Sequence, residues 1–336
     1  MRARVIKANP SSCSEGTIYY NKIYTRGTRV MTADRLPPDR KVWTTLATNT
    51  NYIDGVVALD YSLKRVKSLY PLLVLYTDSF EPAGHKILDD LGIYKKKIDY
   101  LLPCVHKDYS NDTRFYDCWS KLQPFSLTEF SRVVQLDSDM IVVQNMDELM
   151  EIPLGSVAFA ATYACVCNPY NKPHYPKDWT AANCVYSHYN ANAEHHYLGP
   201  GFDQPKNKIL MCNGGLQVVN PSVRNFEMII ERLNNPESTN TYDFADQSLL
   251  SDVFKGNWLP LSYKYNALKT LRTIHAKVWD DNEVKNIHYI LTPKPWNTRE
   301  NDDTGLFSVW HDIDAERKAK SKSSTLISGE QTLHPK

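Results

Sequence analysis

Apolar positions along the first half of the chain alternate between short continuous runs and runs with helical spacing. The β-branched and apolar run 42–50 predicts a strand, and residues 51–71 then predict a helix that Pro71 ends. Residues 71–78 predict a buried strand, 81–92 a short helix closed by Gly92, and 96–103 another strand. This alternation predicts an α/β fold with a mostly parallel central sheet flanked by helices, whose ligands bind beyond the carboxyl ends of the strands.

The second half continues with further predicted elements. They are a helical stretch over 116–129, strands over 133–137, 157–162 and 214–222, helices over 223–235 and 243–256, and a strand and loop over 286–296. Between them, residues 163–210 are polar and lack periodicity, and a stretch of this length inside a domain is typical of a functional insertion or lid.

The distribution of proline, glycine and charged residues predicts the boundaries of the domain. Residues 1–40 lack periodicity and predict an irregular N-terminal arm. Residues 41–310 are expected to form a single domain that carries the insertion 163–210. Charges and serines dominate the end of the chain, so we expect residues 311–336 to be a flexible tail.

Composition excludes several classes of protein. The chain has 336 residues, is 42% apolar and 11% aromatic, and carries a formal net charge of +1, which supports a large core and gives no global attraction to nucleic acid or anionic lipid. No apolar run approaches the roughly 18 residues that span a bilayer, and no signal-type stretch follows the basic start. We therefore expect a cytosolic protein without a membrane span.

The seven cysteines are scattered through the chain, which is typical of a reduced compartment rather than a disulfide framework. Cys165, Cys167 and Cys184 could together hold a metal ion. A zinc site normally has four ligands and C-x-x-C spacing, so small buried thiols are the favoured interpretation.

Neither a P-loop nor a G-x-G-x-x-G fingerprint is present, so phosphate would have to be held in another way. The stretch VVQLDSDMIV, residues 133–142, places Asp137 and Asp139 at the carboxyl end of a predicted strand. Two carboxylates so close can bind a hard cation such as Mn²⁺ or Mg²⁺ together with phosphate oxygens. Alternatively, the motif is an ordinary surface turn.

Four other stretches carry candidate chemistry. His288 and Lys294 in IHYILTPKPW could complete a metal site and bind a diphosphate, or be a core histidine and a solvated lysine. In CNGGLQVVNPS, Asn213 and Gly214 could let the backbone approach a ligand, or form a bulge. Asp246 could bind a sugar or complement a helix dipole.

The stretch TTLATNTNY ends the first predicted strand. Thr48, Asn49 and Tyr52 could hydrogen-bond and stack on a nucleobase, and a strand that leads into a capped helix would explain them equally well.

Six stretches in this order resemble the retaining glycosyltransferases of family 8, the glycogenin and galactinol synthase group. They are LATNTNY, SKLQPFSLTEFSRVVQLDSDMIV, CNGGLQVVNPS, DQSLL, YNAL and HYILTPKPW. The resemblance runs from about Trp43 to Trp296, and DGVVALDYSLKRVKSLYPLLVL and YNALKTLR look most like galactinol synthases.

The resemblance implies a single nucleotide-binding α/β domain of the GT-A type and a role for each matching residue. Mn²⁺, with Mg²⁺ as an alternative, would be bound by Asp137, Asp139 and His288. The residues implied in binding the nucleotide, its diphosphate and the donor sugar are Leu46, Thr48, Asn49, Tyr52, Lys121, Ser138, Asn213, Gly214 and Lys294. Asp246 and Gln247, implied as catalytic, would also surround the donor sugar.

The implied reaction is Mn²⁺-dependent transfer of a hexose from a UDP-sugar to an acceptor hydroxyl with retention of configuration. The first expectation is galactose transfer to myo-inositol. The alternatives are glucose or N-acetylglucosamine transfer to a glycan or protein, a UDP-sugar hydrolase, and a binding protein without turnover. We expect residues 163–210, with His188, His195 and His196, to select the acceptor, and a homodimer is left open.

The chain departs from glycogenin at two places. Leu291 stands where relatives of glycogenin place a glycine, so backbone contact with phosphate is not expected there. The stretch NALKTLRTIHAKVW has no tyrosine where glycogenin carries its own acceptor, so self-glucosylation at that site is not expected.

Overall fold

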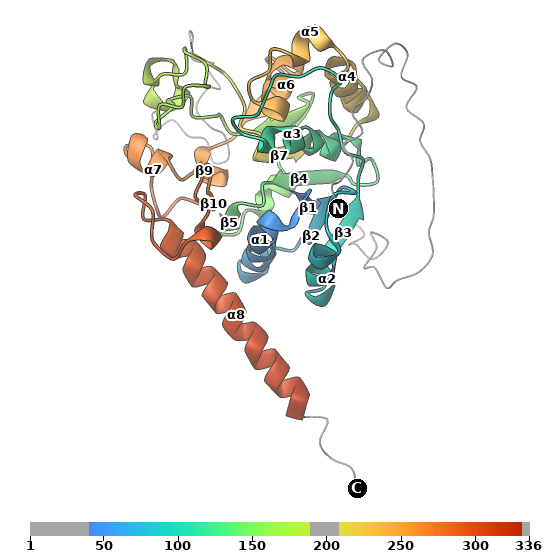
Figure 1. Cartoon of the computed structure of the whole chain (residues 1–336), viewed down its shortest axis with the longest axis vertical. Helices are drawn as coiled ribbons and strands as arrows, with labels where there is room; N and C mark the ends of the chain where they lie inside the picture. Colours follow the sequence, from blue (N-terminus) through green and yellow to red (C-terminus); the bar gives the residue numbers. More distant parts are fainter. Residues whose placement is uncertain (1–39, 189–207, 331–336) are drawn as a thin grey trace.

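A central sheet runs through the molecule in the computed structural model, which describes residues 40–188 and 208–330 (Figure 1). From one edge to the other, its seven strands are β3 (Tyr94–Lys97), β2 (Leu72–Tyr76), β1 (Lys41–Ala47), β4 (Arg132–Leu136), β7 (Leu216–Val219), β6 (Phe159–Ala161) and β8 (Trp258–Pro260). Pairing is parallel from β3 to β4, antiparallel on both sides of β7, and parallel again between β6 and β8. The predicted α/β fold with a mostly parallel sheet is confirmed.

The helices lie on both sides of this sheet (Figure 1). In chain order, the main ones are α1 (Ile53–Arg65), α2 (Pro82–Asp90), α3 (Arg114–Cys118), η4 (Trp119–Ser126), α4 (Val223–Leu233), α5 (Pro236–Thr239) and α6 (Ala245–Val253). The short helix α7 (Leu271–Ile274) contacts the smaller sheet described below. Local chemistry sets several of their ends. Ser222 caps α4 by accepting from the backbone of Asn225, and Gly92, with a φ of +63°, follows the end of α2.

A second, smaller sheet brings the end of the chain against its middle. It has the order β5 (Met140–Val142), β10 (Asn286–His288) and β9 (Ala267–Leu268). β10 runs antiparallel to β5 with His288 opposite Met140. The register places His288 beside the turn that joins β4 to β5.

The segment 163–210 follows β6. Its described part contains the short 3₁₀ helices η6 (Ala181–Asn183) and η7 (Val185–His188). His195 and His196 lie outside the described residues, as do residues 1–39 of the predicted N-terminal arm. The division of the chain at residues 40, 163, 210 and 310 stays a prediction.

The C-terminal segment differs from the expected flexible tail, because α8 covers Phe307–Glu330. Phe307, Trp310 and Ile313 share one face of the helix and are buried in the core. Glu316 accepts hydrogen bonds from Tyr61 at 2.9 Å and from Arg65 at 2.9 Å, which tie α8 to α1. The apolar face therefore anchors a segment whose charge and serine content suggest disorder.

One predicted strand is also shifted. The sequence predicts it over residues 96–103, whereas β3 covers Tyr94–Lys97. Ile93 is buried just before it, and the aliphatic stem of Lys95 is buried within it.

None of the helices in the described ranges combines the length and apolar character needed to cross a membrane.

Candidate functional site

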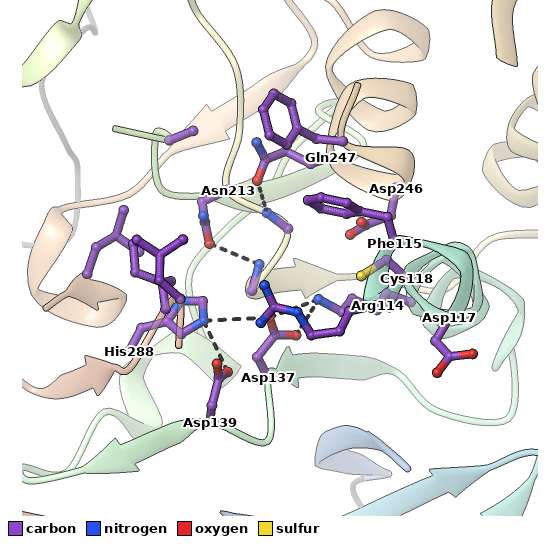
Figure 2. A pocket seen from close by; sticks show the side chains of 18 of the residues that line it. Arg114, Phe115, Asp117, Cys118, Asp137, Asp139, Asn213, Asp246, Gln247 and His288 are labelled. Carbon is purple, nitrogen blue, oxygen red and sulfur yellow. Dashed lines mark hydrogen bonds and ion pairs between the residues drawn. The ribbon is translucent and has the colours of Figure 1, made fainter. Parts of the chain in front are cut away.

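One pocket at the carboxyl ends of β1 and β4 gathers nearly all of the predicted site residues (Figure 2). Those that line it are Leu46, Thr48, Asn49, Tyr52, Lys121, Asp137, Ser138, Asp139, Asn213, Gly214, Asp246, Gln247 and His288. Lys294 does not line the pocket but binds the carboxylate of Asp139, which does. Residues distant in the chain thus meet at the sheet edge where the sequence predicts a site.

The turn that carries Asp137 and Asp139 is fixed by backbone contacts from three other segments. The amide of Asp137 donates to the carbonyl of Gly215 at 2.8 Å, and the amide of Tyr289 donates to the carbonyl of Asp139 at 2.9 Å. On the third side, a Cβ atom at Gly55 of α1 would collide with the backbone carbonyl of Ser138. The aspartates therefore belong to a buttressed turn and not to an ordinary surface turn.

His288 completes a group of three metal-binding side chains. Its Nε2 lies 3.2 Å from Asp139 Oδ1 and 3.6 Å from Asp137 Oδ2 (Figure 2). One ligand atom from each residue lies within 4.8 Å of the other two. Neighbouring ligands of a small divalent cation with bonds of about 2.1 Å are separated by about 3 Å, so this group fits such an ion.

Asn266 orients the imidazole of His288 so that Nε2 can bind a cation. Its Nδ2 donates to Asn213 Oδ1 at 2.8 Å and to Thr162 Oγ1 at 3.0 Å, and its Oδ1 faces His288 Nδ1 at 2.8 Å. Because the amide nitrogen is the donor in both other contacts, Oδ1 accepts a hydrogen bond from Nδ1. Nε2 then keeps its lone pair for a cation.

Each aspartate is also paired with a lysine, the partly buried Lys121 for Asp137 and the buried Lys294 for Asp139. Lys121 Nζ lies 2.8 Å from Asp137, and Lys294 Nζ binds Asp139 and donates to the carbonyl of Tyr289 at 2.7 Å. Burial by itself raises the pKa of Asp139, but Lys294 and His288 outweigh it and hold that pKa well below its usual range. Burial lowers the pKa of Lys294, and the Asp139 carboxylate opposes that shift. The ion pair favours the charged form of both groups.

The residues at the end of β1 have structural contacts of their own. Thr48 donates to Asp117 at 2.8 Å, and Asn49 caps the 3₁₀ helix η3 (Thr50–Tyr52) by accepting from the amide of Asn51. A structural role as a helix cap, the alternative to nucleobase binding in the sequence analysis, therefore holds for Asn49. The ring of Tyr52 lies edge-on to Trp296 with centroids 5.4 Å apart.

Asp246 faces the aspartate pair from another wall of the pocket, at the start of α6 (Figure 2). It is 3% exposed, and its Oδ2 has no hydrogen-bond partner among the described residues. Burial raises the pKa of Asp246 to about 7, with Lys121 opposing and Asp137 reinforcing the shift. Complementing a helix dipole does not require burial, so a role for Asp246 in the pocket stays a prediction.

The backbone before Asp246 is strained. Ala245 is fully buried and has a φ of +36°, in the left-handed region that L-residues rarely adopt. This conformation begins α6 and places the next two side chains at the pocket. The carbonyl oxygen of the Gln247 side chain accepts from the amide of Gly214 at 3.2 Å.

Two glycines allow these walls to approach closely. A Cβ atom at Gly214 would collide with Asp246 Oδ2, and one at Gly215 would collide with the imidazole of His288. The sequence predicts close approach of this backbone to a ligand. The close contacts seen are with the side chains of two site residues, and the approach to a ligand stays a prediction.

Several lining residues were not identified from the sequence. Among them are Arg114, Phe115, Asp117, Cys118, Asn168, Pro169, Tyr175, Trp179, Phe244, Leu268 and Thr270. Trp179 stacks on Phe244 with centroids 4.3 Å apart, and Tyr175 meets Phe244 edge-on at 5.1 Å. The aromatic residues inside the otherwise polar segment 163–210 were the available signal, and they form an apolar wall.

Leu291, where the sequence departs from relatives of glycogenin, also lines the pocket. Its φ is +67°, a conformation that glycine adopts readily and a β-carbon disfavours. The chain therefore keeps the backbone conformation expected of a glycine without having one.

Comparison with known proteins identifies relatives in the family that the sequence resembles. The sequence model of Glycosyl transferase family 8 matches residues 43–300. Galactinol synthase 1 of Solanum lycopersicum is 30% identical, covering 75% of this chain and 72% of that protein. Galactinol synthase 1 of Arabidopsis thaliana is 27% identical, covering 88% of this chain and 85% of that protein.

Solved structures confirm the fold. The bifunctional glycosyltransferase WbbM superposes with a TM-score of 0.56 at 18% identity, covering 82% of this chain and 50% of that chain. The galactosyltransferase LgtC, in complex with donor and acceptor sugar analogs, gives a TM-score of 0.53 at 16% identity, covering 82% of this chain and 96% of that chain. The architecture is that of GT-A glycosyltransferases, as the resemblance implies.

Proposed function

The chain belongs to glycosyl transferase family 8, and from this premise we propose that it transfers a hexose from a UDP-sugar to an acceptor hydroxyl with retention of configuration. Glycosyltransferase activity follows from the family, and the nucleotide sugar, the acceptor and the metal are the proposal. The observation that carries it is the convergence of Asp137, Asp139 and His288 at the edge of a pocket that also contains Asp246 and Gln247.

The donor set of Asp137, Asp139 and His288 supports Mn²⁺ as the bound ion, with Mg²⁺ as the alternative. Two carboxylates and an imidazole suit Mn²⁺, which accepts both oxygen and nitrogen ligands. When bound, such an ion supplies positive charge to the departing diphosphate. Asn266 would keep the imidazole lone pair directed at it.

Lys121 and Lys294 would assist from the protein side. Lys294 is buried and Lys121 partly buried, and each ammonium group reaches one carboxylate of the aspartate pair. Preorganised charge in a site that excludes water stabilises negative charge that develops in the transition state. We therefore propose that both lysines contact the diphosphate of the donor, while Leu46, Thr48, Asn49, Tyr52 and Ser138 contact the nucleoside and its phosphates.

On another wall, Asn213, Gly214, Asp246 and Gln247 would surround the donor sugar. The Asp246 carboxylate has an oxygen without a hydrogen-bond partner among the described residues. The ionised carboxylate could attack the anomeric carbon to form a glycosyl-enzyme, with UDP leaving. An acceptor hydroxyl would then displace the carboxylate, which takes up the hydroxyl proton. Alternatively, the acceptor attacks on the same face as the leaving phosphate, and Asp246 stabilises the positive charge on the sugar. Both routes give retention.

Galactose transfer to myo-inositol is the donor and acceptor pair that we propose first, because the curated relatives at 26–30% identity are galactinol synthases. The aromatic wall of Tyr175, Trp179 and Phe244 offers an apolar face of the kind that packs on a sugar or cyclitol ring. Transfer of glucose or N-acetylglucosamine to a glycan or protein is the second proposal.

The cytosolic location and a homodimer stay predictions.

A panel of UDP-sugars and acceptors, assayed with and without Mn²⁺, tests this proposal. We expect UDP release from UDP-galactose to increase on addition of myo-inositol and to require the metal. Stimulation by another acceptor would support the second proposal. UDP release that no acceptor changes would favour a hydrolase, and UDP-sugar binding without any release would favour a binding protein.

A further inference from the structure

A second cluster of metal-binding side chains lies next to the pocket and takes no part in the proposed reaction. Cys165 and Cys167 follow β6, Cys184 lies between η6 and η7, and His275 directly follows α7. Their ligand atoms all lie within 4.8 Å of one another. The three cysteines are candidates from the sequence alone, and the fold adds a histidine from a distant segment.

The spacing within this cluster is that of four ligands around one ion. His275 Nε2 lies 3.6 Å from Cys165 Sγ, 3.2 Å from Cys167 Sγ and 3.7 Å from Cys184 Sγ, and the Cys165 and Cys184 sulfurs are 4.0 Å apart. A tetrahedral Zn²⁺ ion with bonds of about 2.3 Å to sulfur and about 2.0 Å to nitrogen separates its ligands by about 3.5–3.8 Å. The distances in the cluster scatter around these values.

Neither a disulfide nor a network of neutral hydrogen bonds fits the cluster as well as a metal ion does. A disulfide requires sulfurs about 2.05 Å apart, whereas all three cysteines are free. Neutral hydrogen bonds do not account for three sulfurs that converge on one imidazole nitrogen, because that nitrogen offers a single lone pair or a single N–H group. Cys184 and His275 are buried, so water is a poor substitute partner.

We propose that Cys165, Cys167, Cys184 and His275 bind a single structural zinc ion. The protein supplies all four ligands, which is the arrangement of a closed structural site rather than a catalytic one. Three soft thiolates and one imidazole select zinc, whereas the two carboxylates of the pocket suit a harder ion. The two groups therefore bind different metals.

The zinc site supports one wall of the pocket. Cys165 itself lines the pocket, and the stretch between Cys167 and Cys184 carries Tyr175 and Trp179 of the aromatic wall. The ion would tie both ends of this stretch to His275. Few regular elements hold residues 163–188 in place, so a metal crosslink would fix the aromatic wall without a larger core.

Metal analysis of the full-length protein tests the proposal independently of activity. After dialysis against EDTA, we expect about one zinc ion per folded chain by mass spectrometry of the elements, because a closed site releases metal slowly. Exchange with Co²⁺ should add the charge-transfer absorption of thiolate bound to cobalt. Folded wild-type protein that contains no zinc and binds Co²⁺ without this absorption would overturn the proposal.

Substitutions locate the ion. Cys184→Ser and His275→Ala should lose most of the zinc and unfold at a lower temperature, whereas His275→Cys should retain zinc with four sulfur ligands. Cys212→Ser removes a buried free thiol elsewhere, and Asp139→Asn disables the other metal group. Both controls should keep zinc at the wild-type level.

Zinc retained by Cys184→Ser and His275→Ala, or lost from Asp139→Asn, would overturn the assignment. If the two cluster variants do not fold, the zinc content of wild type and the cobalt spectrum of His275→Cys decide the matter. The readout of these experiments is bound metal and not turnover. The zinc proposal can therefore fail while the proposed sugar transfer holds, and the proposed sugar transfer can fail while the zinc proposal holds.

Discussion

Asn266 Oδ1 lies 2.8 Å from His288 Nδ1 and holds the imidazole with Nε2 toward the aspartate pair. The two residues are 22 positions apart in the sequence, and the pairing of β9 with β10 brings them together. The contact fixes which imidazole nitrogen faces the proposed metal.

Replacing Asn266 by alanine should therefore weaken metal binding by about 10–100-fold, because the imidazole loses the acceptor that sets its tautomer. The measurement is the Mn²⁺ concentration that gives half-maximal turnover. Asn145→Ala, at an exposed asparagine that does not line the pocket, is the control and should behave as the parent does. An unchanged Mn²⁺ requirement in Asn266→Ala would contradict the orienting role.

Gly214→Ala should reduce turnover by about a hundredfold, since the new Cβ atom displaces the Asp246 carboxylate and small misplacements of reacting groups are costly. Gly155→Ala is the matched control. Gly155 has a positive φ, +56°, but open space around it, so the substitution strains the backbone without touching the pocket. It should lower stability by about 1 kcal/mol and leave turnover unchanged. Equal turnover in the two variants would refute the close contact.

Asp246→Asn should abolish turnover and yet stabilise the metal-free protein at neutral pH. The folded pKa of Asp246 is raised to about 7, and the unfolded value is about 3.9. Between these values the folded state holds a proton that the unfolded state has released, so the wild type loses stability as pH rises through this window. Asparagine does not titrate, so the variant keeps the stability that the wild type loses as pH rises.

Urea unfolding in EDTA at several pH values measures this effect. The advantage of Asp246→Asn over wild type should grow from near zero at about pH 4 to about 2–4 kcal/mol at about pH 8. Wild type and variant that respond identically to pH would mean that Asp246 ionises normally.

Lys294→Ala should weaken UDP binding by about 10–100-fold, the range expected when a charged hydrogen bond to phosphate is lost. Calorimetric titration with UDP in the presence of Mn²⁺ measures this affinity. Lys86, exposed on α2 and paired with Asp90, provides the control Lys86→Ala. Binding by Lys294→Ala as tight as that of the parent would show that this lysine does not touch phosphate.

The parts of the fold that the sequence predicts are those with a local signal. β4 is buried on both faces, so its residues are mostly apolar or amide-bearing, and the aspartates stand out at its end. Asp137, Asp139 and His288 could be assigned because their stretches resemble a family. Their spatial convergence required the structure.

What the sequence missed depends on distant contacts. β9 has only two residues, too few for any periodicity, yet it places Asn266 beside His288. His275 has no local signal of metal binding, because its partners lie in other segments. Composition alone predicts a flexible tail over 311–336, whereas α8 continues to Glu330 from a first part whose Phe307, Trp310 and Ile313 pack into the core.

Turnover of Asp139→Asn, with the donor and acceptor identified in the panel and with saturating Mn²⁺, tests most directly whether the aspartate pair holds the catalytic metal. We predict a loss of at least about a hundredfold relative to wild type, because a metal that neutralises the leaving group is worth several kcal/mol. Asp90→Asn, at an exposed aspartate of α2, should match wild type. Turnover by Asp139→Asn close to the wild-type rate would contradict the assignment of the metal to this turn.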